Sequence, residues 1–323
     1  MFAICATCAV EYTTPPPEVC PICADEREWS VPDDGQRWTS LAALRADGQR
    51  LTWSEAEPNR VEIGTEPSLG IGQTAQLVTT PAGSLLWDPT GYLDDVTVER
   101  ILARGPVLAV AASHPHMFGV QVAWGEALDA PVLVCAADEQ WVGRRSDRVE
   151  LYEESRELAP GLSLHRVGGH FPGSAIAHWA DGADGRGVIL SGDTVYPNPD
   201  GRSVGFLRSY PNRLPLSAAV VRHIADQLAS FEFDRIVGNF TNSIETGARE
   251  AVEWSAQRHI AWVRGDHDGE TGAAEVHPAR RRTGRDLREA LAQTDAPDDG
   301  FASDIAGAVG NLGQEVADPW RDA

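Results

Sequence analysis

Short apolar runs recur between residues 60 and 240 and predict β-strands. Residues 74–80 and 84–87 alternate around a Pro-Ala-Gly turn, which predicts a hairpin. Residues 107–112 and 132–137 are continuously apolar, which is typical of strands buried on both faces. Further strands are predicted at residues 162–167, 174–179, 188–191 and 235–240.

Apolar residues at helical spacing fill most of the intervals between these strands. This pattern predicts helices at residues 94–104, 117–128, 216–230 and 245–264. A strand-rich block is therefore followed by alternating strands and helices. That order favours the α/β (α+β) class, with a mixed sheet covered by helices.

The two ends of the chain differ from this central pattern. Residues 1–30 contain four cysteines, and residues 31–59 are polar, with a short helix expected near residues 40–46. We expect a cysteine module at 1–30, a connector at 31–59 and the main domain at 60–270. Residues 271–323 are polar and acidic, so we expect a weakly packed tail with at most a short helix at 285–292.

The cysteines of the first module form two pairs, each with two residues between its members. Their spacing is C-x2-C-x11-C-x2-C, given by Cys5, Cys8, Cys20 and Cys23. One tight turn can point both sulfurs of a pair at the same ion, and two turns complete a closed tetrahedral site. The alternative is four unligated thiols. For a metal, zinc and iron both remain open.

Three predicted strands end in side chains that bind metals. A Ser-His-Pro-His run carries His114 and His116 directly after the strand at 107–112, and Gly-Gly-His places His170 after the strand at 162–167. Ser-Gly-Asp places Asp193 after the strand at 188–191. Loops at strand ends converge over a rigid sheet. We therefore predict that three imidazoles and one carboxylate hold one ion.

These motifs, in this order and at these separations, resemble the metal-binding motifs of the metallo-β-lactamase fold superfamily. The resemblance covers about residues 60–264, and the hairpin ending in Leu-Leu-Trp-Asp resembles the opening strands of that fold. It implies a four-layer αββα sandwich with metal at one edge of the sheets. The Cys-Pro-Ile-Cys turn is similar to a rubredoxin or zinc-ribbon knuckle.

The resemblance is incomplete at the second metal position of the superfamily. An aspartate and a histidine of its first motif correspond to Phe118 and Gly119, and a later histidine corresponds to Asn239. His267 follows a further helix and is a weak substitute. We therefore expect one metal in the main domain, and we expect the Phe118 ring to make its pocket drier.

Composition limits the classes of partner and of chemistry. The net charge is −21, which disfavours binding to nucleic acid. All 27 basic residues are arginine, so a lysine Schiff base is excluded. We find no apolar stretch long enough to span a membrane and no secretory signal, so we expect a cytoplasmic protein that acts on a small molecule.

The site predicts a zinc-dependent hydrolase for an ester, thioester, lactone or similar bond. His116 and Asp193 are its expected catalytic residues, and Asp193 would orient a water or take its proton. The irregular segment 196–215 is expected to face an anionic or carbonyl-bearing substrate through Tyr196, Arg208 and Tyr210. Two alternatives stay open: an iron-dependent redox or electron-transfer protein, and a non-catalytic metal-binding member of the fold.

Overall fold

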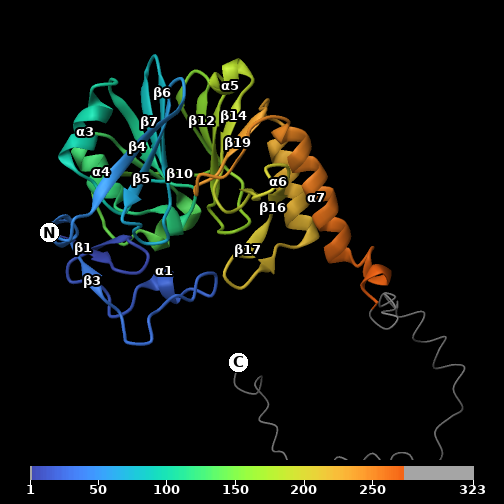
Figure 1. Ribbon diagram of the computed structural model, residues 1–323, viewed down its shortest axis with the longest axis horizontal. Helices are drawn as coiled ribbons and strands as arrows, with labels where there is room; N and C mark the ends of the chain where they lie inside the picture. The colour runs from blue at the N-terminus through green and yellow to red at the C-terminus, as the bar shows by residue number, and fades with distance from the viewer. Residues whose placement is uncertain (1, 273–323) are drawn as a thin grey trace, which may run out of the picture. The chain divides into compact units, whose positions relative to one another are not determined.

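Two β-sheets lie face to face in the structure, a computed structural model that describes residues 2–272 (Figure 1). The first sheet has the order β10-β9-β8-β7-β6-β5-β4. Its strands pair antiparallel from β4 to β7 and parallel from β7 to β10. They are β4 (Arg50–Glu57), β5 (Arg60–Glu66), β6 (Ala75–Thr80), β7 (Gly83–Trp87), β8 (Val107–Ala111), β9 (Val132–Cys135) and β10 (Val149–Tyr152).

The second sheet has the order β11-β12-β13-β14-β19-β20. Adjacent strands in this sheet pair antiparallel, except that β14 and β19 pair parallel. Its strands are β11 (Ser155–Ala159), β12 (Leu162–Arg166), β13 (Ala175–Trp179), β14 (Val188–Leu190), β19 (Arg235–Val237) and β20 (Ser243–Ile244).

Helices cover the outer face of each sheet, as Figure 1 shows. The first sheet packs against α3 (Asp95–Leu102) and α4 (Gln121–Ala127), and the second against α6 (Ala218–Leu228) and α7 (Ala248–Arg264). The described residues also form short helices: α1 (Pro21–Ala24), α2 (Leu41–Ala46), α5 (Gly182–Gly185), η1 (Pro115–Met117) and η2 (Ala136–Trp141).

Alternating side chains along the central strands build separate cores. Leu85 and Trp87 of β7 lie in the core between the sheets, whereas Leu86 packs on the outer face beneath the helices. In β14 the outer residue is Ile189, which packs with α6 and α7. This period-two alternation makes both faces of each sheet apolar. The predicted αββα sandwich is confirmed.

The N-terminal residues join the first sheet's outer core instead of standing apart from it. A small sheet of order β2-β1-β3 is formed by β1 (Phe2–Cys5), β2 (Glu11–Thr13) and β3 (Trp38–Thr39). Its apolar residues pack with Val61 and Ile63 of β5. The amide of Glu11 donates to the carbonyl of Gly119 at 3.0 Å. The cysteine module therefore rests on the sandwich.

Within the segment expected as a connector, residues 50–57 form the edge strand β4, which continues the first sheet. The unit that contains both sheets ends at His267. Of the unit that follows, the structure describes residues 268–272, which include η3 (Asp268–Thr271). The expected helix at 285–292 lies outside the described residues. Among the described helices, none combines the length and apolar character needed to cross a membrane.

Candidate metal centres and the adjoining pocket

The ligand loops begin where the central strands end. His114 is the N-cap of η1, which follows β8, and η1 carries His116. His170 lies beyond β12, and Asp193 lies three residues beyond β14. Between Asp193 and its strand is Gly192, where a Cβ atom would lie 2.2 Å from the Ser113 hydroxyl. Glycine there lets the Asp193 loop approach the histidine loop closely.

The four predicted ligands meet in the folded chain. One ligand atom from each of His114, His116, His170 and Asp193 lies within 4.8 Å of all the others, and all four residues are buried. His116 Nδ1 is 3.3 Å from His170 Nε2. Asp193 Oδ2 is 3.6 Å from His114 Nε2 and 3.8 Å from His170 Nε2. Ligands of a tetrahedral zinc ion at 2.0–2.1 Å lie roughly 3.4 Å apart, so the set has the size of a metal site.

Hydrogen bonds outside the cluster orient two of the imidazoles. The Ser113 hydroxyl donates to Asp88 Oδ2 at 3.1 Å and lies 2.9 Å from His114 Nδ1. Since its proton goes to Asp88, this hydroxyl accepts from His114 Nδ1, and the lone pair of His114 Nε2 faces the cluster. His170 Nδ1 donates to the carbonyl of Leu207 at 3.1 Å, which likewise leaves Nε2 as the inner atom. Such outer hydrogen bonds are usual for metal-binding histidines.

The inner nitrogen of His114 is buried and has no hydrogen-bond partner in the described residues. Leaving a buried polar atom unsatisfied costs about 1–3 kcal/mol. An ion among the four ligand atoms would satisfy His114 Nε2. The residues present therefore fit a metal ion.

Burial sets the protonation of the cluster. It lowers the pKa of His114 and His116 well below the ordinary histidine value and that of His170 to about 4. Burial raises the pKa of Asp193 to about 7, although the Asn239 amide donates to its Oδ1 at 3.2 Å. Neutral imidazoles are the form that binds metal. A bound cation would supply the positive charge that this buried carboxylate lacks.

The four module cysteines form a second, sulfur-only cluster. Cys5 and Cys23 sulfurs lie 3.6 Å apart, and Cys8 and Cys20 sulfurs lie 3.7 Å apart. These separations are far beyond a disulfide bond. They match the roughly 3.8 Å expected between sulfurs around a tetrahedral zinc ion. All four cysteines are buried, so the cluster is closed to solvent.

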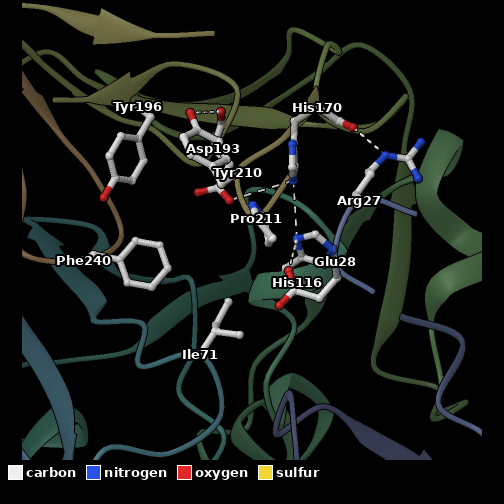
Figure 2. Close-up of a pocket in the computed structure, with 10 residues that line it drawn as sticks. All are labelled: Arg27, Glu28, Ile71, His116, His170, Asp193, Tyr196, Tyr210, Pro211 and Phe240. Carbon is white, nitrogen blue, oxygen red and sulfur yellow. Dashed lines mark hydrogen bonds and ion pairs between the residues drawn. The ribbon is translucent and has the colours of Figure 1, made fainter. Parts of the chain in front are cut away.

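A cavity of about 190 Å³ opens beside the histidine cluster. Its lining includes His116, His170 and Asp193. Figure 2 shows Tyr196 and Phe240 on one side and Arg27 and Glu28 on the other. The remaining lining residues are Ile71, Tyr210 and Pro211. The cavity therefore gives a small molecule access to the predicted metal site.

The three residues predicted to contact substrate occupy different places. Tyr196 and Tyr210 line the cavity, and the Tyr210 hydroxyl donates to the main-chain carbonyl of Asp193 at 2.8 Å. Arg208 instead forms an ion pair with Glu26 of the N-terminal module and is not among the lining residues. Substrate contact by Tyr196 and Tyr210 remains a prediction.

At the second metal position the structure corrects one expectation. Phe118 does not line the cavity, because it follows η1 and its ring packs into the outer core of the first sheet. Gly119 has φ +50°, and a Cβ atom there would lie 2.3 Å from the carbonyl oxygen of Pro89. Asn239 contacts Asp193, as described above. His267 lies outside the ligand set, with its ring centroid 4.9 Å from that of Trp262.

Sequence reasoning missed five lining residues, of which Arg27 and Glu28 are the charged ones. These two follow the last module cysteine and reach a site formed mostly by residues beyond 110. Arg27 Nε donates to the carbonyl of His170 at 2.8 Å, and Glu28 Oε2 lies 4.0 Å from His116 Nδ1. No local pattern marks these residues. The only signal was their proximity in sequence to Cys23.

Comparisons with known proteins agree with this fold. No protein-family model matches the chain. It is 40% identical over 264 residues to the uncharacterized protein YmaE of Bacillus subtilis (strain 168), covering 80% of this chain and 96% of YmaE. It is similar to the solved structure of VMB-1, with a TM-score of 0.50 and 12% identity over 66% of this chain and 98% of VMB-1.

A second solved structure is the metallo-β-lactamase FIM-1 from Pseudomonas aeruginosa in its mono-zinc form. Its TM-score is 0.48 at 16% identity, covering 66% of this chain and 96% of FIM-1. The structural neighbours are metallo-β-lactamases, and the fold of this chain is metallo-β-lactamase-like.

Proposed function

This chain belongs to the same family as YmaE of Bacillus subtilis, and from its site we propose that it is a metal-dependent hydrolase of esters, thioesters, lactones or similar bonds. The ion would be held by His114, His116, His170 and Asp193. We propose zinc, because a set of three imidazoles and one carboxylate suits it. The substrate would be a small molecule, with neither nucleic acid nor membrane as a partner.

One observation carries the proposal: three buried imidazoles and a buried carboxylate converge beside an open cavity. The Ser113 hydroxyl bonds His114 Nδ1 and so orients the ring. His114 Nε2 has no hydrogen-bond partner in the described residues. A purely structural cluster needs no cavity next to it. An accessible cavity is what a catalytic metal site requires.

A zinc ion bound here would polarise a substrate carbonyl and lower the pKa of a bound water. The protein's own residues would position the reactants. Asn239 donates to Oδ1 of Asp193, which leaves Oδ2 facing the histidines as the ligand oxygen. From this position Asp193 would also orient a water beside the ion. The rings of Tyr196 and Phe240 would exclude bulk water from that space.

For the cysteine cluster we propose a second zinc ion with a structural role. Four thiolates leave no open position for substrate. The buried module also has little independent core, so the ion would supply free energy for its folding. An iron ion at the same cysteines would colour the protein, and a visible absorption spectrum separates the two metals.

The proposed function is tested by zinc-loaded full-length protein on a panel of esters, thioesters and lactones. We expect turnover of at least one compound, and a loss of activity of 100-fold or more in His116→Ala because one ligand is removed. His223→Ala is the matched control, since His223 is exposed on α6 and is not part of the ligand set. Equal activity of His116→Ala and the control would contradict the proposal.

A further inference from the structure

The charged residues around the cavity provide few free positive groups that could bind an anionic substrate. Arg27 is the arginine among the lining residues, and the chain contains no lysine. Its Nη1 binds Asp25 Oδ1 at 2.7 Å and its Nε binds the carbonyl of His170. The guanidinium also stacks on the Phe171 ring at 4.2 Å, and Arg27 is only 8% exposed. Arg27 therefore holds the His170 loop and has little capacity to bind a ligand.

Arg208, the arginine that the sequence predicted to contact substrate, also forms an ion pair with another residue. Arg208 pairs with Glu26, two residues before Glu28 in the chain. The Ser209 hydroxyl donates to the carbonyl of Arg27 at 2.7 Å, and the Asn212 amide donates to that of Glu26 at 3.0 Å. These contacts fasten segment 207–212 to the loop after Cys23. Arg208 is not among the residues that line the cavity, and its ion pair with Glu26 occupies its guanidinium.

Glu28 gives this wall an acidic side chain. Its carboxyl group is 16% exposed and lines the cavity. Its nearest ionisable partner among the described residues is the neutral His116 imidazole, with Nδ1 at 4.0 Å, and no arginine forms an ion pair with it there. With a divalent ion bound, Asp193 and Glu28 would together match the charge of the ion. A further negative group on the substrate would then meet Glu28, and the one arginine in the lining, Arg27, is already paired with Asp25.

The opposite wall is aromatic. The Tyr196 ring centroid lies 4.9 Å from that of Tyr210 and 6.3 Å from that of Phe240. The Tyr210 hydroxyl is already bound to the Asp193 carbonyl, so Tyr210 presents mainly its ring. The cavity of about 190 Å³ is smaller than the roughly 300–1,000 Å³ of sites for drug-sized ligands. Its size and lining suit a short apolar group.

We propose that the cavity takes small, uncharged carbonyl compounds with an apolar or aromatic acyl group, and that Glu28 is the residue that selects against anionic ones. This inference rests on the proposed hydrolase function. In such a hydrolysis the water oxygen bonds to the acyl carbon, and the bond from that carbon to the alkoxy oxygen breaks. One proton completes the alcohol and the other leaves the acid. The carboxylate product is anionic, so Glu28 also favours its release.

The test compares two esters of similar acyl length, 4-nitrophenyl pentanoate and the anionic 4-nitrophenyl hemisuccinate. With zinc-loaded full-length protein we expect kcat/KM to favour the neutral ester at least 10-fold. Glu28→Gln should reduce this preference at least threefold, chiefly by lowering KM for the anionic ester. Glu250→Gln, a surface change in the first turn of α7, should leave the ratio unchanged. Equal or better use of the anionic ester by the wild type would overturn the proposal.

A binding measurement separates failure of this inference from failure of the hydrolase proposal. Calorimetry of the zinc-loaded protein with phenylacetate and phenylacetamide reports the charge preference without turnover. We expect Glu28→Gln to lower the Kd of phenylacetate at least threefold and to leave the Kd of phenylacetamide unchanged. If neither ester is cleaved but this shift is seen, the hydrolase proposal fails and the charge selection stands. Unchanged affinities for both ligands would overturn the role of Glu28.

Discussion

Ser113 connects the predicted metal ligands to the core of the first sheet. Its amide and hydroxyl both donate to Asp88, a fully buried carboxyl group whose pKa burial raises to about 8. When Asp88 is ionised, the same hydroxyl accepts from His114 Nδ1 and so fixes the tautomer of His114. The network thus decides which nitrogen of His114 faces the other ligands. Without this hydrogen bond His114 could adopt either tautomer, and its affinity for the metal would be lower.

Replacing Ser113 should therefore weaken metal binding without removing a ligand. We expect Ser113→Ala to lower the zinc affinity of the histidine site about 10- to 100-fold, measured by competition with a chelator. Ser163→Ala is a matched control, because Ser163 lies 2.8 Å from His165 Nε2, outside the metal site. A zinc affinity equal to that of the control would show that Ser113 does not orient His114.

Between η1 and α4 the backbone passes so close to the segment after β7 that no side chain fits. Gly119 has a positive φ, and its missing Cβ would meet the carbonyl oxygens of Pro89 and Thr90 at 2.3 and 2.7 Å. Both contacts are backbone atoms, which cannot move aside easily. This turn also receives the hydrogen bond from β2 of the cysteine module. The packing of two elements thus excludes a histidine where two-metal members of the fold have one.

We expect Gly119→Ala to lower the free energy of unfolding by about 3 kcal/mol or more, through backbone strain and overpacking. Gly48→Ala separates these two causes, because Gly48 has φ +84° but open space around its Cβ position. The control should lose only about 1 kcal/mol. Denaturant unfolding measures both. Similar losses would mean that the clash at Gly119 relaxes, and a histidine there would then be feasible.

Across the whole molecule, the cysteine cluster and the histidine cluster are linked by one short segment. The amide of Ser30 donates to the carbonyl of Cys23 at 2.9 Å, which closes the loop that carries Arg27 and Glu28. That loop in turn holds His170 and forms one wall of the cavity. We therefore expect the cavity to form only when the cysteine module is folded. Removing residues 1–30 would damage both clusters, so point variants are the better probe.

The sequence was most informative where strong local patterns coincide with chemistry. Continuous apolar strands that end in histidine or aspartate predicted the site, because the loops after these strands bring their ligand atoms together. The edge strand β4 was missed because its residues are mostly exposed, and only Leu51 and Trp53 of its inner face pack on the core. Glu28 was missed because its place depends on how the module docks. Phe118 was misplaced because η1 turns its side chain toward the outer core.

The central claim is that the chain binds two metal ions, one at each cluster, and metal analysis of the full-length protein tests it most directly. We predict two ions per chain in the wild type, with one lost in His116→Ala and one lost in the double variant Cys20→Ser/Cys23→Ser. Cys135→Ser, a buried cysteine outside the cluster, should keep both ions. Three ions per chain, or no loss in His116→Ala, would contradict the account.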